Sequence, residues 1–242
     1  MMEAKIDGLK INYSIRNSSE ASKPRIDHKL GDFTVVIPED QDLDAEELLK
    51  QKESWVAKKR KEFLRFKRKI PDRNLSNGSK ITILGEEKEI TVQTARKNQI
   101  NDKIILAEHL VEQTSLKDQL EKALRERARE VIEQKIEDHK DKVDGEHEEI
   151  FIRDQQTKWG SCSSKSNLNF NWRLVLAPQH VLEYVVVHEL VHLEERNHSE
   201  KFWSRVRGIL PKYQRSNKWL AKNSAQLVFD KSLILENEKN TE

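Results

Sequence analysis

The 242-residue sequence contains a single cysteine, Cys162, and this scarcity excludes several classes of fold. A disulfide framework or a zinc ribbon needs more than one thiol, so neither can form within this chain. No apolar run approaches about eighteen residues, which excludes a membrane-spanning helix. Residues 1–15 contain neither an apolar core nor a small-residue cleavage site, so we expect no secretory signal. Together these absences predict a cytoplasmic protein.

Aromatic residues are also few, at 6%, and hydrophobic residues are no more frequent than charged ones, at 36% each. Such a composition favours long helices with solvated faces around an economical core. The net charge of +2 does not by itself indicate a nucleic-acid binder. Basic residues nevertheless crowd the stretch 58–73, which we interpret as a solvated helix face, with a phosphate-binding patch as the alternative. A steep salt dependence of DNA or RNA binding would favour the alternative.

The spacing of apolar residues predicts a chain of mixed α and β structure. In the first half it predicts strands within 5–38, a helix from Asp42 to Pro71, a turn at 74–79, a hairpin of 81–85 and 90–92 around Gly85–Lys88, and a strand at 104–106. In the second half it predicts a long amphipathic helix at 115–143, a strand at 149–153, a polar loop at 154–167, a strand at 168–176, and helices at 179–196 and 199–210. We expect domains at 1–106 and 107–225, followed by a polar tail at 226–242.

The segment that points to chemistry is His188-Glu-Leu-Val-His192. Residues four apart on a helix project from one face, so both imidazoles can ligate one tetrahedral zinc ion. Glu189 lies one residue further along, where its carboxylate can approach a metal-bound water without taking a coordination position. The alternative is a pair of histidines that only hydrogen-bond in a core. Because the helix is apolar almost all round and unpaired buried polar groups are costly, we favour the metal site.

Catalytic zinc generally takes three protein ligands and leaves one position to water. Two kinds of residue could supply the third ligand: His198, which follows His192 at a short distance, or a glutamate on a later helix. After Glu200 the next glutamate is Glu236, in the expected tail, so the sequence favours His198. Metzincins have a glycine between the second and third histidines and a methionine further along the chain. Here Glu195 is at the glycine position and no methionine follows Met2, which excludes that class. We therefore predict one zinc ion (Zn2+) per chain.

Residues 150–205 resemble the SprT/YgjP-like, or WLM-like, zinc metallopeptidase family. The motifs that carry the resemblance are His188-Glu-Leu-Val-His192, Asn197-His-Ser-Glu-Lys-Phe-Trp203, Trp159-Gly-Ser-Cys162 and Phe170-Asn-Trp-Arg-Leu174. A looser resemblance covers most of residues 10–222. It implies an α+β, zincin-like fold with a β-rich N-terminal portion and a helical C-terminal domain, which makes 107–225 the catalytic domain.

The resemblance also implies an activity, the zinc-dependent hydrolysis of peptide bonds in peptides or proteins. By analogy His188, His192 and His198 are the zinc ligands and Glu189 is the general base. The strand 168–176 is either the sheet edge on which an extended peptide is bound or ordinary sheet interior, and the sequence does not separate the two.

Three further residues have two interpretations each. Tyr213 could stabilise the oxyanion of the transition state, although a packed tyrosine is the favoured interpretation. Cys162 could approach the metal as an inhibitory thiolate, but a small buried side chain is favoured. Arg173 could bind substrate, but an ion pair is favoured.

Two other functions compete with peptide hydrolysis. One is a nucleic-acid-associated SprT-like protein that uses the basic stretch 58–73. The other is a zinc-stabilised scaffold without catalysis, which the intact Glu189 disfavours.

Overall fold

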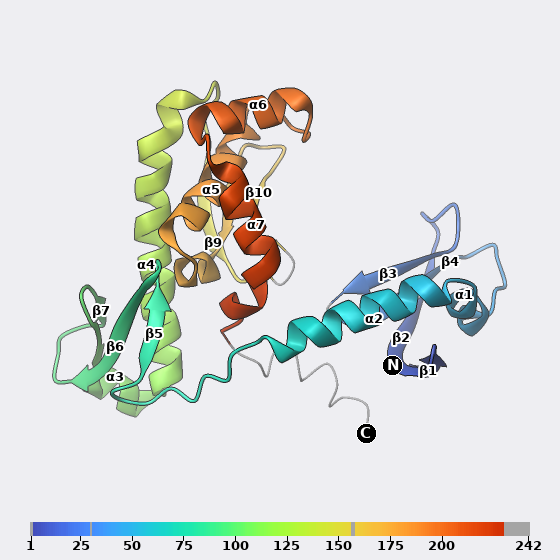
Figure 1. Ribbon diagram of the computed structural model, residues 1–242, viewed down its shortest axis with the longest axis horizontal. Helices are drawn as coiled ribbons and strands as arrows, with labels where there is room; N and C mark the ends of the chain where they lie inside the picture. Colours follow the sequence, from blue (N-terminus) through green and yellow to red (C-terminus); the bar gives the residue numbers. More distant parts are fainter. Residues whose placement is uncertain (1, 30, 156–157, 230–242) are drawn as a thin grey trace. The chain divides into compact units, whose positions relative to one another are not determined.

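The computed structural model describes residues 2–29, 31–155 and 158–229. Contacts within the chain divide it into two compact units, with the division between Asp72 and Arg73 (Figure 1). Each unit has a hydrophobic core of its own. The domain boundary that we expect between residues 106 and 107 lies at a different place in the chain, and it stays a prediction. None of the described helices combines the length and the apolar composition needed to cross a bilayer.

The first unit contains a mixed sheet and two helices. Its elements are β1 (Met2–Ile6), β2 (Leu9–Ser18), β3 (Arg25–Lys29), β4 (Asp32–Pro38), α1 (Ala45–Gln51) and α2 (Glu53–Arg68). The strand order is β1-β2-β4-β3, with β2 and β4 parallel and the other pairs antiparallel. Asp7 and Gly8 close the β1–β2 hairpin with φ of 49° and 72°, the positive values that a type I′ turn requires. The predicted strands and helix are confirmed, although Lys52 divides the helix in two.

The second unit begins with a sheet of the order β5-β6-β8-β7. Its strands are β5 (Lys80–Ile83), β6 (Glu86–Gln93), β7 (Gln99–Ile100) and β8 (Ile104–Ala107). The predicted hairpin is present, but its turn is shorter than expected, and Glu86–Lys88 belong to β6. Leu84 and Gly85 form the turn with φ of 53° and 90°. A two-residue turn of this type matches the strand twist, so the strands pair right up to it.

Helix α4 (Leu116–His139) confirms the long amphipathic helix that the apolar stripe predicts. The short α3 (Glu108–Gln113) precedes it and a 3₁₀ turn (Lys140–Lys142) follows it. The Ser115 hydroxyl caps α4 by accepting a hydrogen bond from the N–H of Asp118. The stripe packs in one core with β5–β8 and with the C-terminal helices, so residues 80–107 are part of the same unit. Figure 1 shows α4 along one side of this unit.

A second sheet in this unit consists of β9 (Ile150–Arg153), β10 (Gly160–Cys162) and β11 (Leu168–Asn171), in the order β10-β11-β9. The expected polar loop therefore contains a strand, β10, which has no apolar alternation to reveal it. The central strand is β11, parallel to β9 and antiparallel to β10, so it is sheet interior and not an edge. It is also shorter than expected. The Asn171 side chain accepts a hydrogen bond from the N–H of Arg173 and begins a 3₁₀ helix at Trp172–Leu176.

The C-terminal helices are α5 (Gln179–Val191), α6 (Glu200–Ile209) and α7 (Tyr213–Asn223), with a 3₁₀ turn (Ser224–Leu227) after them. Helix α5 ends earlier than the expected residue 196, α6 agrees with its prediction, and α7 is a helix that the sequence did not reveal. Both α6 and α7 pack against α5, which also packs against α4 (Figure 1). In the expected polar tail, Leu227 and Phe229 are buried, and residues 230–242 lie outside the described residues.

Candidate metal centre

Helix α5 is apolar and buried along most of its circumference, so it folds as an internal helix. His188 and Glu189 lie in its last turn, and His192 is the residue at which it ends. The two histidines are one helical turn apart and project from the same side. Their ring centroids are 4.9 Å apart. The two imidazoles therefore lie close together, as the helical spacing of the motif predicts.

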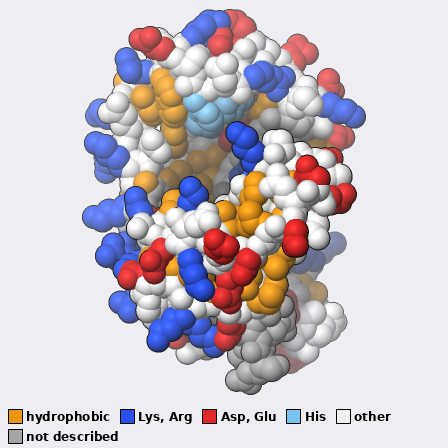
Figure 2. Space-filling view, turned by 90° about the vertical axis from the view of Figure 1, so that its right-hand side faces the viewer, with side chains coloured by type: hydrophobic (Ala, Val, Ile, Leu, Met, Phe, Trp, Pro, Cys, Tyr) orange, Lys and Arg blue, Asp and Glu red, His pale blue; other side chains and the backbone are white. Residues whose placement is uncertain are grey.

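His198 reaches the same place because the chain turns back after α5. Backbone N–H groups that follow Val191 donate to its carbonyl, and Ser199 then caps the first turn of α6. The Nε2 atoms of His198 and His188 are 2.9 Å apart. His192 completes the group, and each of the three histidines offers a ring nitrogen that lies within 4.8 Å of the other two. Figure 2 shows one group of histidine side chains that reaches the surface beside hydrophobic side chains.

Aromatic rings from α6 hold the three imidazoles in position. The ring of Phe202 is fully buried and lies 4.6–4.9 Å from all three histidine rings, and Trp203 stacks on His198 at 5.6 Å. The Nδ1–H of His192 donates to the carbonyl of Glu195 at 2.9 Å, which leaves its Nε2 with a free lone pair. Packing and hydrogen bonding therefore orient the group before any metal binds.

Burial favours the neutral form of two imidazoles, those of His188 and His192. Burial, together with the neighbouring His192 and His198, lowers the pKa of His188 to about 3, and burial also lowers the pKa of His192. A metal binds only the neutral imidazole, so these pKa shifts favour ligation at neutral pH. The carboxyl of Glu189 is affected in the opposite direction. Burial raises its pKa to about 8, although the charge of Lys158 and the N–H of Cys162 both act to lower it.

A divalent metal ion fits this donor set. The Oε2 atom of Glu189 is buried without a hydrogen-bond partner among the described residues, and such an atom is costly unless something binds it. In a tetrahedral zinc site with Zn–N bonds of about 2.0–2.1 Å, two ligand nitrogens are about 3.3 Å apart. The Nε2 atoms of His188 and His198 are 2.9 Å apart and all three nitrogens lie within 4.8 Å of one another, a range that includes this value. Within the described part of the chain, no second group of three such donors converges.

Strand β10 lies directly against the carboxylate of Glu189. The backbone N–H of Cys162 donates a hydrogen bond to that carboxylate. A Cβ atom added to Gly160 would be 2.7 Å from the Cγ and Oε1 atoms of Glu189, a separation that real Cβ atoms essentially never show. Gly160 is therefore a glycine because the strand and the carboxylate approach so closely. Sequence reasoning found the Trp159–Cys162 motif but not this contact, which depends on the fold.

The other residues with two interpretations are Tyr213, Cys162 and Arg173, and each has protein partners in the structure. Tyr213 is buried and stacks on Trp203 at 5.5 Å, so its part in stabilising a transition state stays a prediction. Cys162 is half-buried, and its thiol receives a hydrogen bond from Arg196 at 3.3 Å. Arg173 is buried in an ion pair with Asp154, as the favoured interpretation has it.

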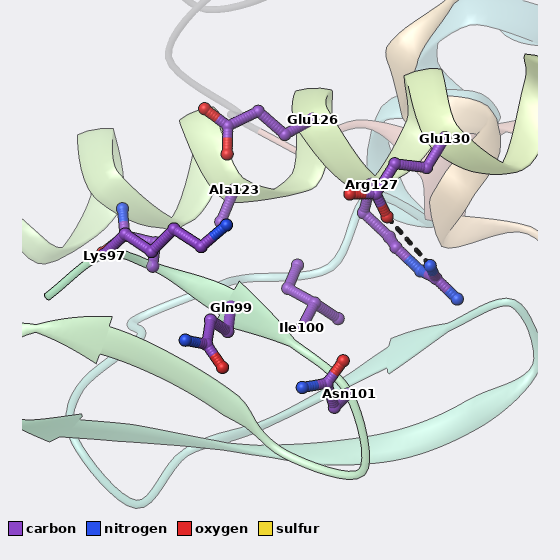
Figure 3. A pocket seen from close by; sticks show the side chains of 9 residues that line it. Lys97, Gln99, Ile100, Asn101, Ala123, Glu126, Arg127 and Glu130 are labelled. Carbon is purple, nitrogen blue, oxygen red and sulfur yellow. Dashed lines mark hydrogen bonds and ion pairs between the residues drawn. The ribbon is translucent and has the colours of Figure 1, made fainter. Parts of the chain in front are cut away.

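A cavity of about 420 Å³ opens beside the histidines, and Tyr184, His188 and Glu189 line it. Tyr184 is a residue that sequence reasoning missed, although it precedes His188 by one helical turn. A second cavity of about 310 Å³ lies between β7 and α4 (Figure 3). Its charged side chains are two basic and two acidic ones, Lys97, Arg127, Glu126 and Glu130, with an ion pair between Arg127 and Glu130. Because these charges balance, the cavity attracts neither an anionic nor a cationic ligand.

Several cations of the basic stretch 58–73 already have protein partners. Lys59 pairs with a glutamate one turn later at 2.9 Å, and Lys61 pairs with Asp7 at 2.8 Å. In the second unit, Arg73 donates to the backbone carbonyls of Gln226 and Val228. These contacts leave fewer cations of the stretch available for phosphate, and the choice between a solvated helix face and a phosphate-binding patch stays a prediction.

Comparison with known proteins agrees with the geometry of the centre. The family model described as the YgjP-like metallopeptidase domain matches residues 23–223, which is most of the chain and includes the three histidines. A search of curated proteins finds no match. The match to the family model covers both compact units of the structure in large part. The chain belongs to the YgjP-like family of metallopeptidase domains.

Proposed function

We propose that this chain is a zinc-dependent peptidase, in which His188, His192 and His198 hold the metal and Glu189 is the general base. One observation carries the proposal: three converging ring nitrogens lie beside a buried carboxylate oxygen that has no partner among the described residues. A bound zinc ion would lower the pKa of a water molecule and polarise the carbonyl of the peptide bond. Membership of a metallopeptidase family supports hydrolysis as the reaction.

In this proposal Glu189 moves the proton. It takes a proton from the attacking water and delivers it to the amine that leaves. A base that accepts and then donates a proton works best with a pKa near the operating pH. Burial raises the pKa of Glu189, and the charge of a zinc ion bound beside it would act in the opposite direction. The N–H of Cys162 and the backbone of Gly160 hold the carboxylate in one position.

The substrate binds in an extended form along β10. Of the three strands in its sheet, β10 is at one edge, and it packs against α5 beside Glu189. A peptide that adds to a sheet edge gains backbone hydrogen bonds irrespective of its sequence. The central strand β11 is excluded from this role because both of its sides are paired.

A nucleic-acid-associated function through residues 58–73 stays the alternative. The ion pairs of Lys59 and Lys61 leave fewer cations for phosphate than the sequence suggests. The geometry of the metal centre therefore supports hydrolysis more strongly.

We expect the purified protein to bind one zinc ion and to cleave an unfolded protein such as casein. A chelator should abolish the cleavage and added zinc should restore it, because a single group of three donors converges in the described chain. Elemental analysis and a cleavage assay measure the two properties. Two tightly bound zinc ions would contradict the single site, and zinc binding without cleavage of any substrate would favour the scaffold function.

Replacing Gly160 by alanine should reduce turnover by about 10- to 100-fold, the range expected when a catalytic group is misplaced by about 1 Å. The new Cβ atom would displace the Glu189 carboxylate or β10, whereas the histidines keep their positions and the zinc content stays unchanged. Gly208→Ala is the matched control, because nothing lies within 4 Å of a Cβ atom at that position of α6. Equal turnover in the two variants would show that β10 does not position the base.

A further inference from the structure

The cavity beside Glu189 lies between β10 and α7, with α5 as its floor. The residues that lead into β10 form one side, Tyr184 and Val185 of α5 form the floor, and Leu220 and Ala221 of α7 form the other side. We call it the α7 groove. Because Glu189 and His188 also line it, the groove is continuous with the metal centre. Its volume of about 420 Å³ is in the range of small-ligand sites.

The α7 groove is formed before any ligand arrives, because α7 is fastened to α5. The hydroxyl of the buried Ser216 donates to the carbonyl of His180 at 2.9 Å, and Leu220 is buried in the core. The exposed Ala221 lies at the border of the groove, where its short side chain leaves the entrance open. A preformed site avoids the cost of ordering side chains on binding.

The walls of the groove select the chemistry of its occupant. Trp159, Val185, Leu220 and Ala221 present apolar surface, and Asn217 and Ser224 of the α7 side are small polar residues. The ionisable side chains that line the groove, apart from the neutral His188, are Lys158 and Glu189. Both lie at the end of the groove next to β10 and the metal centre, whereas the α7 side contributes no charged side chain. An apolar occupant gains by the removal of its surface from water.

We propose that the α7 groove binds a large apolar side chain of the substrate, such as leucine, methionine or phenylalanine, at a residue flanking the scissile bond. The proposal rests on the proposed function. Side chains of an extended peptide on the β10 edge point alternately to opposite faces, so a residue near Glu189 directs its side chain into the groove. The enzyme therefore prefers unfolded segments rich in apolar residues over polar ones.

Peptides that differ at one position, with leucine, glycine, aspartate or lysine there, test the preference. We expect kcat/KM for the leucine peptide to exceed that for the others by about 10- to 200-fold, the range for filling an apolar pocket. Ala221→Trp should fill the groove and remove most of this preference, with unchanged zinc content. Lys222→Trp is the matched control, since Lys222 is the next residue of α7, is exposed and does not line the groove. Asn217→Trp, one turn earlier on the lined face, serves if Ala221→Trp does not fold.

A binding assay distinguishes a failure of the groove proposal from a failure of the proposed peptidase function. Fluorescence polarisation with the labelled peptides and the zinc-loaded Glu189→Gln variant measures selectivity without cleavage. If the wild type cleaves nothing but the leucine peptide binds selectively and Ala221→Trp abolishes its binding, the peptidase function fails and the groove stands. Equal affinities for all peptides, a preference for aspartate, or an Ala221→Trp variant that behaves like the control would overturn the groove proposal.

Discussion

Replacing Glu189 by glutamine should reduce peptide hydrolysis by about 10²–10⁴-fold or more, while zinc content and Tm stay near those of the wild type. Glutamine has the same size and can still accept the hydrogen bond from the N–H of Cys162. It cannot take a proton from water, so the chemical step loses its base. Glutamine is uncharged, so its burial at this position costs no more free energy than the burial of the carboxylate.

The measurement compares kcat, bound zinc and thermal unfolding for the wild type and two variants. Glu200→Gln is the matched control, because Glu200 is an exposed glutamate in the first turn of α6 close in sequence to the ligand His198. It should hydrolyse peptides at the wild-type rate. Wild-type hydrolysis by Glu189→Gln would show that another group is the base.

Replacing His198 by alanine should remove zinc and activity together, as fully as replacing His192 does. Each substitution takes one of three protein ligands from the metal. The Nε2 atom of His198 is 2.9 Å from that of His188, so His198 belongs to the same group although it comes from the turn after α5. Loss of the metal also lowers Tm, since a ligand that binds only the folded state stabilises it.

Zinc content after dialysis, measured beside kcat/KM and Tm, checks this expectation. His109→Ala is the control, because His109 is exposed in α3 and lies outside the group of converging histidines. It should keep one zinc ion per chain. Full zinc occupancy in His198→Ala would mean that another residue completes the site and that the third ligand is wrongly assigned.

Local sequence patterns accounted for the elements whose cause is local. The apolar stripe of α4 and the cap at Ser115 depend on residues within a few positions of each other, and both are present. The convergence of His188 and His192 follows from helical spacing alone. The cap at Ser199 and the helix α6 were likewise foreseeable from nearby residues.

Elements that depend on distant partners were missed or misjudged. The residues of β10 have no strand pattern of their own, and they are extended because Gly160–Cys162 pair with Leu168–Phe170. The early end of the Leu168 strand is an exception, since its cause is local: the side chain of Asn171 accepts a hydrogen bond from the N–H of Arg173. Helix α7 is held by its packing on α5, a contact between segments far apart in sequence.

The sequence by itself determined the metal-binding motif, its helix and the chemistry of its donors, since these follow from residue type and helical spacing. Only the tertiary structure decided which strand is the sheet edge, why Gly160 has no side chain, and that α7 forms a groove beside Glu189. The physical reason is the separation along the sequence between the residues that interact. Spacing along a helix is set by the local backbone, whereas a close approach between β10, α5 and α7 exists only after hydrophobic burial has brought distant segments together.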